Sequence, residues 1–324
     1  MLAARAISGR ISPYSMRGRV VLITGGSRGL GLVMARQLAR EGAYIAICAR
    51  DEQELERARE DLAGHGAEAL ALPCDVTVRA QVDEMIARVE EHFGQIDVLI
   101  NNAGVIEVGP MDVMTTGDYE EAMRTHFWGP LYTTLAVLPG MRSRGEGRVV
   151  NISSIGGKIS VPHLLPYSAS KFALTGFSEG LRAELAGDGI VVTTVCPGLM
   201  RTGSPHNATF KGRHRKEFAW FMISDSLPLI SMNAERAARQ IIDACKRGDA
   251  EVVLSLPAKV AVLFHGIFPG LTADLLGLVN LALPGPGGIG TARAKGAESR
   301  SALTPHWLTA LSDKAAAENN ELVN

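Results

Sequence analysis

A tyrosine and a lysine in the segment PYSASK, residues 166–171, have a spacing that suits proton transfer. Tyr167 and Lys171 are four residues apart, so both side chains project from the same face of a predicted helix. A phenol with an unperturbed pKa of about 10 is a poor acid or base at neutral pH, and a nearby ammonium group favours the phenolate. Lys171 would supply that charge. The pair is therefore a candidate acid/base that exchanges a proton with a substrate oxygen.

A glycine-rich turn is the second feature with a chemical meaning. Residues 24–31, TGGSRGLG, follow the apolar run VVLIT and precede a segment with helical period. Glycines at positions 25, 29 and 31 allow a sharp turn and let backbone N–H groups approach a phosphate. Such a turn is also an ordinary tight connection in many proteins, and its order G-x-x-x-G-x-G differs from the common fingerprint G-x-G-x-x-G. Its place after the first predicted strand favours a dinucleotide site.

Both features depend on elements that alternate along the chain from Arg19 onward. Short runs rich in β-branched residues are followed by longer segments with helical period, which indicates β-α-β units around a parallel sheet. Near-continuous apolar runs indicate that helices cover both faces of the sheet. We therefore predict a Rossmann-like, doubly wound α/β domain, a three-layer α/β/α sandwich around a parallel seven-stranded sheet. The predicted strands are 20–24, 44–49, 68–72, 96–101, 148–153, 190–196 and 251–255, and the predicted helices are 31–41, 51–63, 78–93, 117–138, 166–186 and 234–246.

Several short motifs occur in order along the chain and together resemble the short-chain dehydrogenase/reductase family. They are the TGxxxGxG turn, CDVT around Asp75, NNAG at 101–104, a serine before Tyr-x-x-x-Lys, and PGLMRT at 197–202. The resemblance covers about residues 19–255. It implies a nicotinamide-dependent oxidoreductase that interconverts a carbonyl and an alcohol.

The resemblance also implies roles for individual residues. Tyr167 would be the acid/base, Lys171 would also hold the nicotinamide ribose, and Ser154, thirteen residues before Tyr167, would hydrogen-bond the substrate oxygen. Ser153 is expected to face the other way along its strand. The implied cofactor-binding residues are Thr24, Gly25, Ser27, Arg28, Gly29, Leu30, Gly31, Arg50, Asp75, Val76, Asn102, Ala103, Gly104, Tyr167, Lys171, Pro197, Gly198 and Thr202.

Position 126 departs from the family pattern. The family usually has an asparagine there, which is thought to hold a water molecule of the proton relay to the lysine, whereas this chain has His126 in RTHFWGP. A histidine can hold a water through either ring nitrogen, so His126 is a fourth candidate catalytic residue. The alternative is a packing role between helix and sheet.

The end of the second predicted strand bears on the choice of cofactor. A site that prefers NAD(H) places an acidic residue there to accept hydrogen bonds from the ribose 2′-hydroxyl, whereas this chain has Ala49 followed by Arg50. Arg28, inside the glycine turn, is a second cation within reach of a 2′-phosphate. Each arginine alone could be a solvated surface charge. Together they favour NADP(H) over NAD(H).

Segment 198–232 stands where the family commonly carries a substrate-covering loop. Its basic run KGRHRK, residues 211–216, is expected to be a solvated lid surface, with a site for acidic headgroups as the alternative. Its large apolar residues favour a lipid-like, steroid-like or acyl carbonyl substrate over a sugar. These residues are Phe210, Phe218, Trp220, Phe221 and Met222.

The two ends of the chain lie outside the resemblance. Residues 1–18 form a basic arm without the apolar core of a secretory signal. Residues 256–324 are expected to be an apolar, helical C-terminal extension. Within it, residues 260–283 contain too many polar residues, glycines and prolines for a membrane-spanning helix, and we predict two short amphipathic helices joined at FPG. These helices would cover the active site, pair subunits, or lie on a membrane surface.

Composition limits the partners. With 33 basic and 34 acidic residues the formal net charge is -1, so no overall field attracts nucleic acid. The four cysteines are widely spaced and the eight histidines form no ligand pattern, which predicts buried free thiols in a reducing compartment and no metal site. We expect a cytoplasmic protein that forms a homo-oligomer and acts on a small molecule, with association to a membrane surface as a further possibility.

Two other classes of function remain open. A nucleotide-sugar epimerase or dehydratase also uses Tyr-x-x-x-Lys, but such proteins usually show TGxxGxxG. A catalytically silent NADP(H)-binding sensor would explain His126, yet such proteins typically lose the tyrosine or the lysine. The presence of Ser154, Tyr167 and Lys171 together favours an active oxidoreductase.

Overall fold

Seven parallel strands form the central sheet of the computed structural model, which describes residues 14–228 and 230–322. The strand order is β11-β7-β6-β4-β1-β2-β3, and every neighbouring pair is parallel. The predicted sheet is confirmed, and its boundaries differ from the predicted ones by two residues or fewer. The strands are β1 (Val20–Thr24), β2 (Tyr44–Ala49), β3 (Ala69–Pro73), β4 (Val98–Asn101), β6 (Gly147–Ile152), β7 (Ile190–Pro197) and β11 (Glu251–Leu254).

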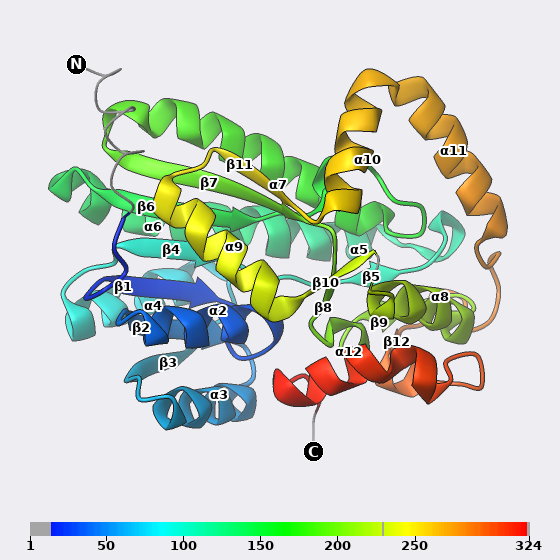
Figure 1. Cartoon of the computed structure of the whole chain (residues 1–324), viewed down its shortest axis with the longest axis horizontal. Helices are drawn as coiled ribbons and strands as arrows, with labels where there is room; N and C mark the ends of the chain where they lie inside the picture. Colours follow the sequence, from blue (N-terminus) through cyan, green and yellow to red (C-terminus); the bar gives the residue numbers. More distant parts are fainter. Residues whose placement is uncertain (1–13, 229, 323–324) are drawn as a thin grey trace.

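Helices cover both faces of this sheet and make the three-layer sandwich that the apolar strands predicted (Figure 1). Every residue of β1 is buried, because its side chains alternate between two apolar interfaces. One layer contains α2 (Gly29–Arg40), α3 (Glu52–Gly64) and α9 (Ala234–Arg247). The other contains α4 (Arg79–Phe93), α6 (Gly129–Arg144) and α7 (Leu165–Glu184).

A π-helical turn interrupts the α-helical winding of the helix predicted over residues 117–138. This helix consists of α5 (Thr116–Met123), a π-helical turn η2 (Arg124–Trp128) and α6, and the N–H group of Gly129 bonds to the carbonyl of Arg124 in the wider π pattern. Pro130 lacks the N–H group that an α-helix would give to the carbonyl of His126, which favours a local change of winding. The predicted helix is therefore confirmed with a π-helical turn inside it, and this turn contains His126.

The predicted lid segment and the C-terminal extension fold together. The lid contains β8 (Leu199–Arg201), β9 (Thr209–Phe210), α8 (His214–Ser226) and β10 (Ser231–Asn233). From the extension, β12 (Ala294–Lys295) pairs antiparallel with β9, and β9 pairs in turn with β5 (Glu107–Val108). Helix α12 (His306–Glu318) packs against α8 (Figure 1). The extension thus becomes part of the cover over the carboxyl ends of the strands. Short 3₁₀ turns are η1 (Met111–Val113), η3 (Ile155–Gly157), η4 (Leu185–Gly187), η5 (Ser204–His206) and η6 (Ala297–Ser299).

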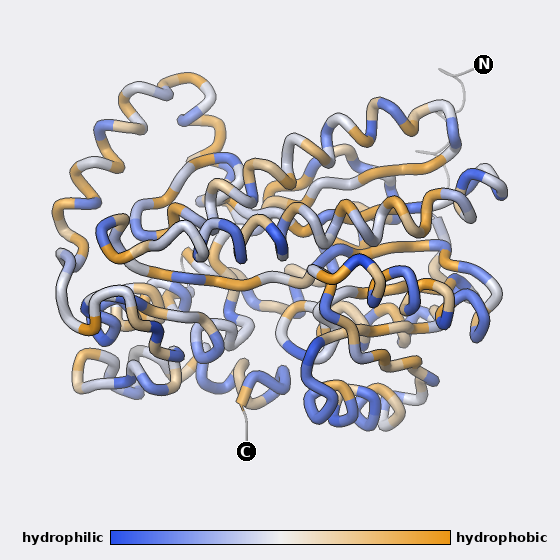
Figure 2. The backbone as a smooth tube through the Cα atoms, turned by 180° about the vertical axis from the view of Figure 1, so that it is seen from behind, coloured by the Kyte–Doolittle hydropathy of each residue, from blue (hydrophilic) through white to orange (hydrophobic). Residues whose placement is uncertain are grey.

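A helical hairpin stands away from the body of the protein. Helices α10 (Leu256–Ile267) and α11 (Pro269–Ala282) meet at Phe268, which confirms the predicted pair of short helices joined at FPG. Figures 1 and 2 show that the hairpin projects from the sandwich. Several of its apolar residues are exposed, among them Leu263 and Leu278. Neither of its helices, nor any other in the described ranges, combines the length and apolarity needed to cross a bilayer.

Residues 1–13 of the predicted basic arm lie outside the described residues. The described end of the arm is packed against the body. Tyr14 donates a backbone hydrogen bond to the carbonyl of Lys246 at 3.1 Å, and its ring lies between the guanidinium groups of Arg19 and Arg148. Met16 is buried in the core layer of α2 and α9.

Candidate active site

The carboxyl ends of the parallel strands open into a cavity of about 840 Å³. It spans the point where strand order reverses between β1 and β4, which is where open α/β sheets bind ligands. All the predicted site residues line this cavity except Thr24 and Gly31. Residues predicted from motifs far apart in the sequence are therefore brought into one site.

Ser154, Tyr167 and Lys171 meet at the end of β6. The Lys171 ammonium nitrogen donates to the carbonyl of Ile152 at 2.8 Å and lies 5.7 Å from the centroid of the Tyr167 ring. Gly156 backs the pair: a Cβ atom there would lie 3.1 Å from the Tyr167 ring and 3.4 Å from the Ser154 hydroxyl oxygen. The phenol and the serine hydroxyl are thus held together.

Ser153 has a different environment from Ser154. Its hydroxyl oxygen lies 3.1 Å from the backbone carbonyl of Lys171 and 2.8 Å from the Thr175 hydroxyl. These contacts fasten β6 to α7. The serine thirteen residues before Tyr167 is the one that packs beside the phenol.

Burial controls the protonation of the catalytic pair. Burial raises the pKa of Tyr167, and hydrogen bonding with Ser154 opposes that rise only in part. Burial lowers the pKa of Lys171 to about 7. The sequence predicted that the Lys171 ammonium would lower the pKa of the Tyr167 phenol. In the structure the effect of burial is larger, and the pKa is raised. At neutral pH Tyr167 is a neutral phenol, the form that donates a proton.

His126 is buried and lies edge-to-face against Tyr167, with ring centroids 5.3 Å apart. Its Nε2 accepts a hydrogen bond from the N–H group of Val105 at 3.1 Å, so Nδ1 carries the proton and donates to the hydroxyl of Ser170 at 2.7 Å. That hydroxyl donates to the carbonyl of Tyr167 at 2.8 Å. Both ring nitrogens are engaged by the protein, which leaves neither to hold a relay water. This geometry argues against the water-anchor hypothesis, which stays a prediction, and favours a positioning role for His126.

Burial, with Lys171 as a second cause, holds the pKa of His126 well below its usual range. We therefore expect no acid limb near pH 6.5 from His126 in the dependence of kcat on pH. Because the unfolded chain binds more protons below about pH 6.5 than the folded one, the free energy of unfolding should fall as the pH drops through that value.

Replacement of His126 by alanine is expected to lower the free energy of unfolding by about 2–4 kcal/mol, because it leaves a buried N–H group unpaired and opens a cavity. It should also reduce the dependence of stability on pH. Chemical denaturation between pH 5 and pH 8 measures both, with His126→Asn as the conservative variant. A wild-type acid limb that His126→Asn removes would restore the relay hypothesis.

The glycine turn is braced by residues of the next motif. The Thr24 hydroxyl accepts hydrogen bonds from the N–H groups of Asn102 and Ala103 at 3.0 and 3.1 Å. The Asn102 amide donates to the carbonyls of Thr24 and Gly25 at 3.1 and 2.9 Å. A Cβ atom on Gly31 would lie 2.1 Å from the Gly25 carbonyl oxygen. Thr24 and Gly31 therefore stabilise the shape of the turn although neither of them lines the cavity.

The other predicted cofactor residues line the cavity through local structure. Asp75 accepts from the N–H group of Thr77 at 2.9 Å and so closes the turn after β3. The Thr202 hydroxyl accepts from the N–H group of Ser204 at 3.2 Å and fixes the start of the lid. Leu30, Val76, Gly104, Pro197 and Gly198 also line the cavity.

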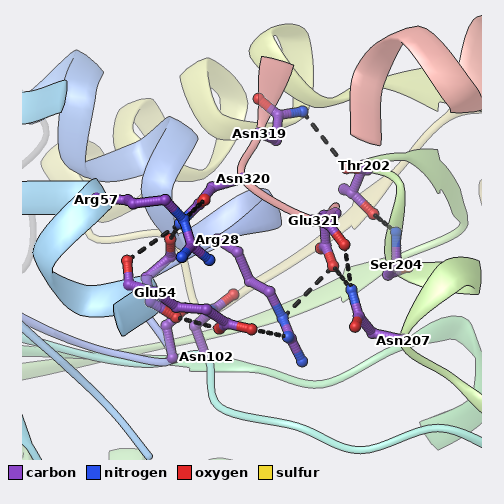
Figure 3. Close-up of polar contacts among 12 residues, drawn as sticks. Arg28, Glu54, Arg57, Asn102, Thr202, Ser204, Asn207, Asn319, Asn320 and Glu321 are labelled. Carbon is purple, nitrogen blue, oxygen red and sulfur yellow. Dashed lines mark hydrogen bonds and ion pairs between the residues drawn. The ribbon is translucent and has the colours of Figure 1, made fainter. Parts of the chain in front are cut away.

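Arg28 and Arg50 both line the cavity, but their surroundings differ. Arg50 is exposed and has no ion-pair partner among residues 14–228 and 230–322. Arg28 lies 2.6 Å from a Glu54 carboxylate oxygen and 3.4 Å from a Glu321 oxygen. Figure 3 shows Arg28 between the two carboxylates. The sequence analysis missed both acids; Glu54 lies in the first turn of α3, but no local signal points to Glu321.

The large apolar residues of the lid turn inward. Phe210, Phe218, Phe221 and Met222 form a small buried core, and the indole of Trp220 donates to Glu217 at 2.7 Å. None of these five is among the described residues that line the cavity. These residues therefore give no support for an apolar substrate, because their side chains pack in the interior of the lid and not along the cavity.

The outer wall of the cavity is charged. Lys211, which was predicted to be solvated, is buried and bonds to the Asp118 carboxylate. Arg293 bonds to Asp118 at 2.7 Å and to Glu107 at 3.0 Å. The lining also includes the apolar residues Ile106, Pro166, Met200 and Ala208. All four cysteines are buried and unpaired, and no metal-binding group of His, Cys, Asp and Glu converges in the described part of the chain.

The chain is similar to several proteins of known sequence or structure. A sequence profile described as short chain dehydrogenase matches residues 19–211. A putative ketoacyl reductase of Streptomyces coelicolor is 41% identical over 185 residues, which cover 56% of this chain and 71% of that protein. A dehydrogenase/reductase SDR family protein 7-like of Drosophila melanogaster is 34% identical over 261 residues, 78% of each chain. The crystal structure of an actinorhodin polyketide ketoreductase with NADPH aligns with a TM-score of 0.66 and 33% identity, over 73% of this chain and 95% of that one.

Proposed function

Because this chain belongs to the short-chain dehydrogenase/reductase family, we propose that it is an NADP(H)-dependent oxidoreductase that interconverts a carbonyl and an alcohol. The observation that carries the proposal is the meeting of Ser154, Tyr167 and Lys171 in the same cavity as the glycine turn. Relatives named as ketoacyl reductases support an enzyme that acts on C=O or CH–OH groups.

The cavity fits a dinucleotide. Gly25 and Gly29 have φ values of 63° and 55°, and glycine at these positions lets a phosphate approach the N-terminus of α2. A bound nicotinamide would supply or accept a hydride. We infer that the backbone of this turn and Arg50 hold the phosphates. We infer that Lys171, which lines the same cavity, holds the nicotinamide ribose.

In the direction of reduction, the substrate carbonyl carbon gains a hydride, and its oxygen gains the electron pair of the broken π bond. Tyr167 then gives its phenolic proton to that oxygen, which yields the alcohol. Ser154 would donate a hydrogen bond to the same oxygen and stabilise the developing charge. In oxidation each transfer is reversed. His126 and Gly156 keep the phenol in place for both directions.

We propose NADP(H) as the cofactor because Arg50 is free to meet a 2′-phosphate and no acid follows β2 directly. A structural relative was solved with NADPH, which is consistent with that choice. We propose an acyl-like substrate with an apolar part, because Ile106, Pro166 and Ala208 line the cavity, and Ile106 and Tyr167 pack against the cluster that contains Ala208. The charged outer wall then faces its polar end.

The experiment that tests this function is a screen of hydrophobic ketones, aldehydes, alcohols and acyl thioesters, with NADPH or NADP⁺ followed by absorbance. Turnover of one compound class supports the oxidoreductase and identifies the substrate. Tight binding of NADPH without any turnover would favour the silent sensor instead. The absence of TGxxGxxG speaks against the epimerase or dehydratase class.

We propose that the hairpin of α10 and α11 binds to a membrane surface. Apolar side chains point outward from both helices, including Leu263, Leu278 and Leu281 at 65%, 64% and 82% exposure, and the charged residues are few. Exposed apolar side chains with few charged neighbours suit a hairpin that lies in the membrane interface with its apolar residues in contact with lipid. The protein would then be a cytoplasmic, peripheral one; its assembly into a homo-oligomer stays a prediction.

The double variant Leu263→Glu and Leu278→Glu is expected to lower binding to phosphatidylcholine vesicles at least about tenfold, because each buried leucine contributes roughly 1.5–3 kcal/mol. Sedimentation with vesicles measures this. Met111→Glu, which changes an equally exposed apolar residue outside the hairpin, is the control. Wild-type protein that ignores vesicles and forms dimers through the hairpin would contradict the membrane proposal.

A further inference from the structure

The last described residues of the chain lie across the dinucleotide side of the cavity. After α12 ends at Glu318, the chain approaches the start of α2, and Asn319, Asn320 and Glu321 lie against the glycine turn (Figure 3). We call these three residues the C-terminal strap. Glu321 is 5% exposed and is itself one of the residues that line the cavity.

The strap uses backbone groups of the glycine turn. The N–H group of Gly29 donates to the carbonyl of Asn319 at 2.9 Å. The side-chain amide of Asn320 donates to the carbonyl of Ser27 at 2.8 Å, and Arg57 donates to its amide oxygen at 2.8 Å. One of the N–H groups at the N-terminus of α2, the kind of group that binds phosphate, is therefore already taken.

The Glu321 carboxylate occupies the open face of the turn. One oxygen lies 2.5 Å from the place where a Cβ atom on Gly29 would be. The other accepts from the Asn207 amide at 2.6 Å and lies 3.4 Å from the Nε atom of Arg28. The space that glycine leaves free for a close approach is thus filled by an anion that pairs with Arg28 and sits at a helix N-terminus.

The Glu321 carboxyl group is buried, and burial disfavours its charged form. Burial raises the pKa of Glu321 to about 7; Arg28 and Asn207 oppose the rise, and Glu54 adds to it. The phosphates of a dinucleotide that arrives at the same turn would need the same N–H group and the same cation, and they would meet the Glu321 carboxylate at close range. The strap and the cofactor phosphates cannot both make these contacts.

We propose that the C-terminal strap competes with the cofactor phosphates for Arg28 and for the N-terminus of α2, so that the cofactor binds only after the strap has left. The inference rests on the proposed function, since it takes a dinucleotide as the competitor. A site that is open for about a tenth of the time has its apparent affinity weakened about tenfold. The C-terminal end of the chain would in this way set the affinity for the cofactor.

The test is to titrate NADPH into the wild type, two strap variants and a control variant, and to follow its fluorescence. Glu321→Gln removes the charge and keeps the shape, and truncation after Glu318 removes the strap. Both variants are expected to bind NADPH about tenfold more tightly than the wild type. Glu318→Gln is the control, because it makes the same change of charge on an exposed side chain that touches no part of the turn. Thermal unfolding shows that each variant is folded.

A direct measurement of displacement accompanies the titration. In the wild type, amide exchange of residues 319–322 should speed up when NADPH is added. Equal Kd values in all folded chains, or weaker binding in both variants, would overturn the strap alone, because the site would still bind the dinucleotide. Folded chains that bind neither NADPH nor NADH, with and without the strap, would overturn the proposed function and the strap with it.

Discussion

Replacing Tyr167 with phenylalanine is expected to lower kcat by about 10²–10⁴-fold, the usual contribution of a general acid, with a Kd for NADPH close to that of the wild type. The variant loses only the phenolic oxygen. Its ring keeps the contacts with His126 and Gly156, and Lys171 keeps its bond to Ile152. The substitution therefore removes the proton donor and leaves the packing around the aromatic ring unchanged.

Steady-state kinetics on a compound found in the screen, with NADPH binding by fluorescence, measure the two effects separately. Tyr132→Phe, at a tyrosine on α6 outside the described lining of the cavity, is the matched control and should retain wild-type kcat. Lys171→Ala should lose turnover and some affinity for NADPH as well. A Tyr167→Phe enzyme that keeps more than about a tenth of wild-type kcat would show that another group donates the proton.

Replacing Arg50 with aspartate is expected to weaken NADPH binding about 10²-fold or more and to leave NADH binding little changed. A charge-assisted bond to a phosphate contributes about 1.5–3 kcal/mol, and the new carboxylate would also repel the 2′-phosphate. With NADH, the same carboxylate can accept hydrogen bonds from the free 2′-hydroxyl. The position suits this test because Arg50 is exposed at the cavity and is not engaged by the acids that hold Arg28.

Binding of both cofactors to wild type and variant measures the preference. Arg40→Asp makes the same change of charge at an exposed position at the end of α2, outside the described lining of the cavity, and should shift neither Kd. Equal losses for NADPH and NADH in Arg50→Asp would mean that Arg50 supports the structure of the loop. A wild type that already prefers NADH would overturn the choice of NADP(H).

Local sequence determined the sheet and the helix that carries Tyr167 and Lys171. The apolar strands of the core, the glycine turn at residues 24–31 and the pair Tyr167 and Lys171 are each fixed by spacing within a few residues. A strand with apolar residues at every position must be buried on both faces, and residues four apart on a helix must share a side. Such features depend little on the rest of the chain, and they were predicted correctly.

What only the tertiary structure decided are the contacts between distant segments. The spacing that placed His126 near the site did not show that Val105 and Ser170 use both of its ring nitrogens. The sequence shows that the lid is rich in aromatic residues. The direction in which their side chains point depends on packing within the lid and against its surroundings. Glu321 reaches Arg28 because β12 joins β9 and α12 packs on α8, so the path of the whole extension sets that contact. Periodicity reports which face of an element is apolar, and it carries no information about which remote side chain will complete a charged site.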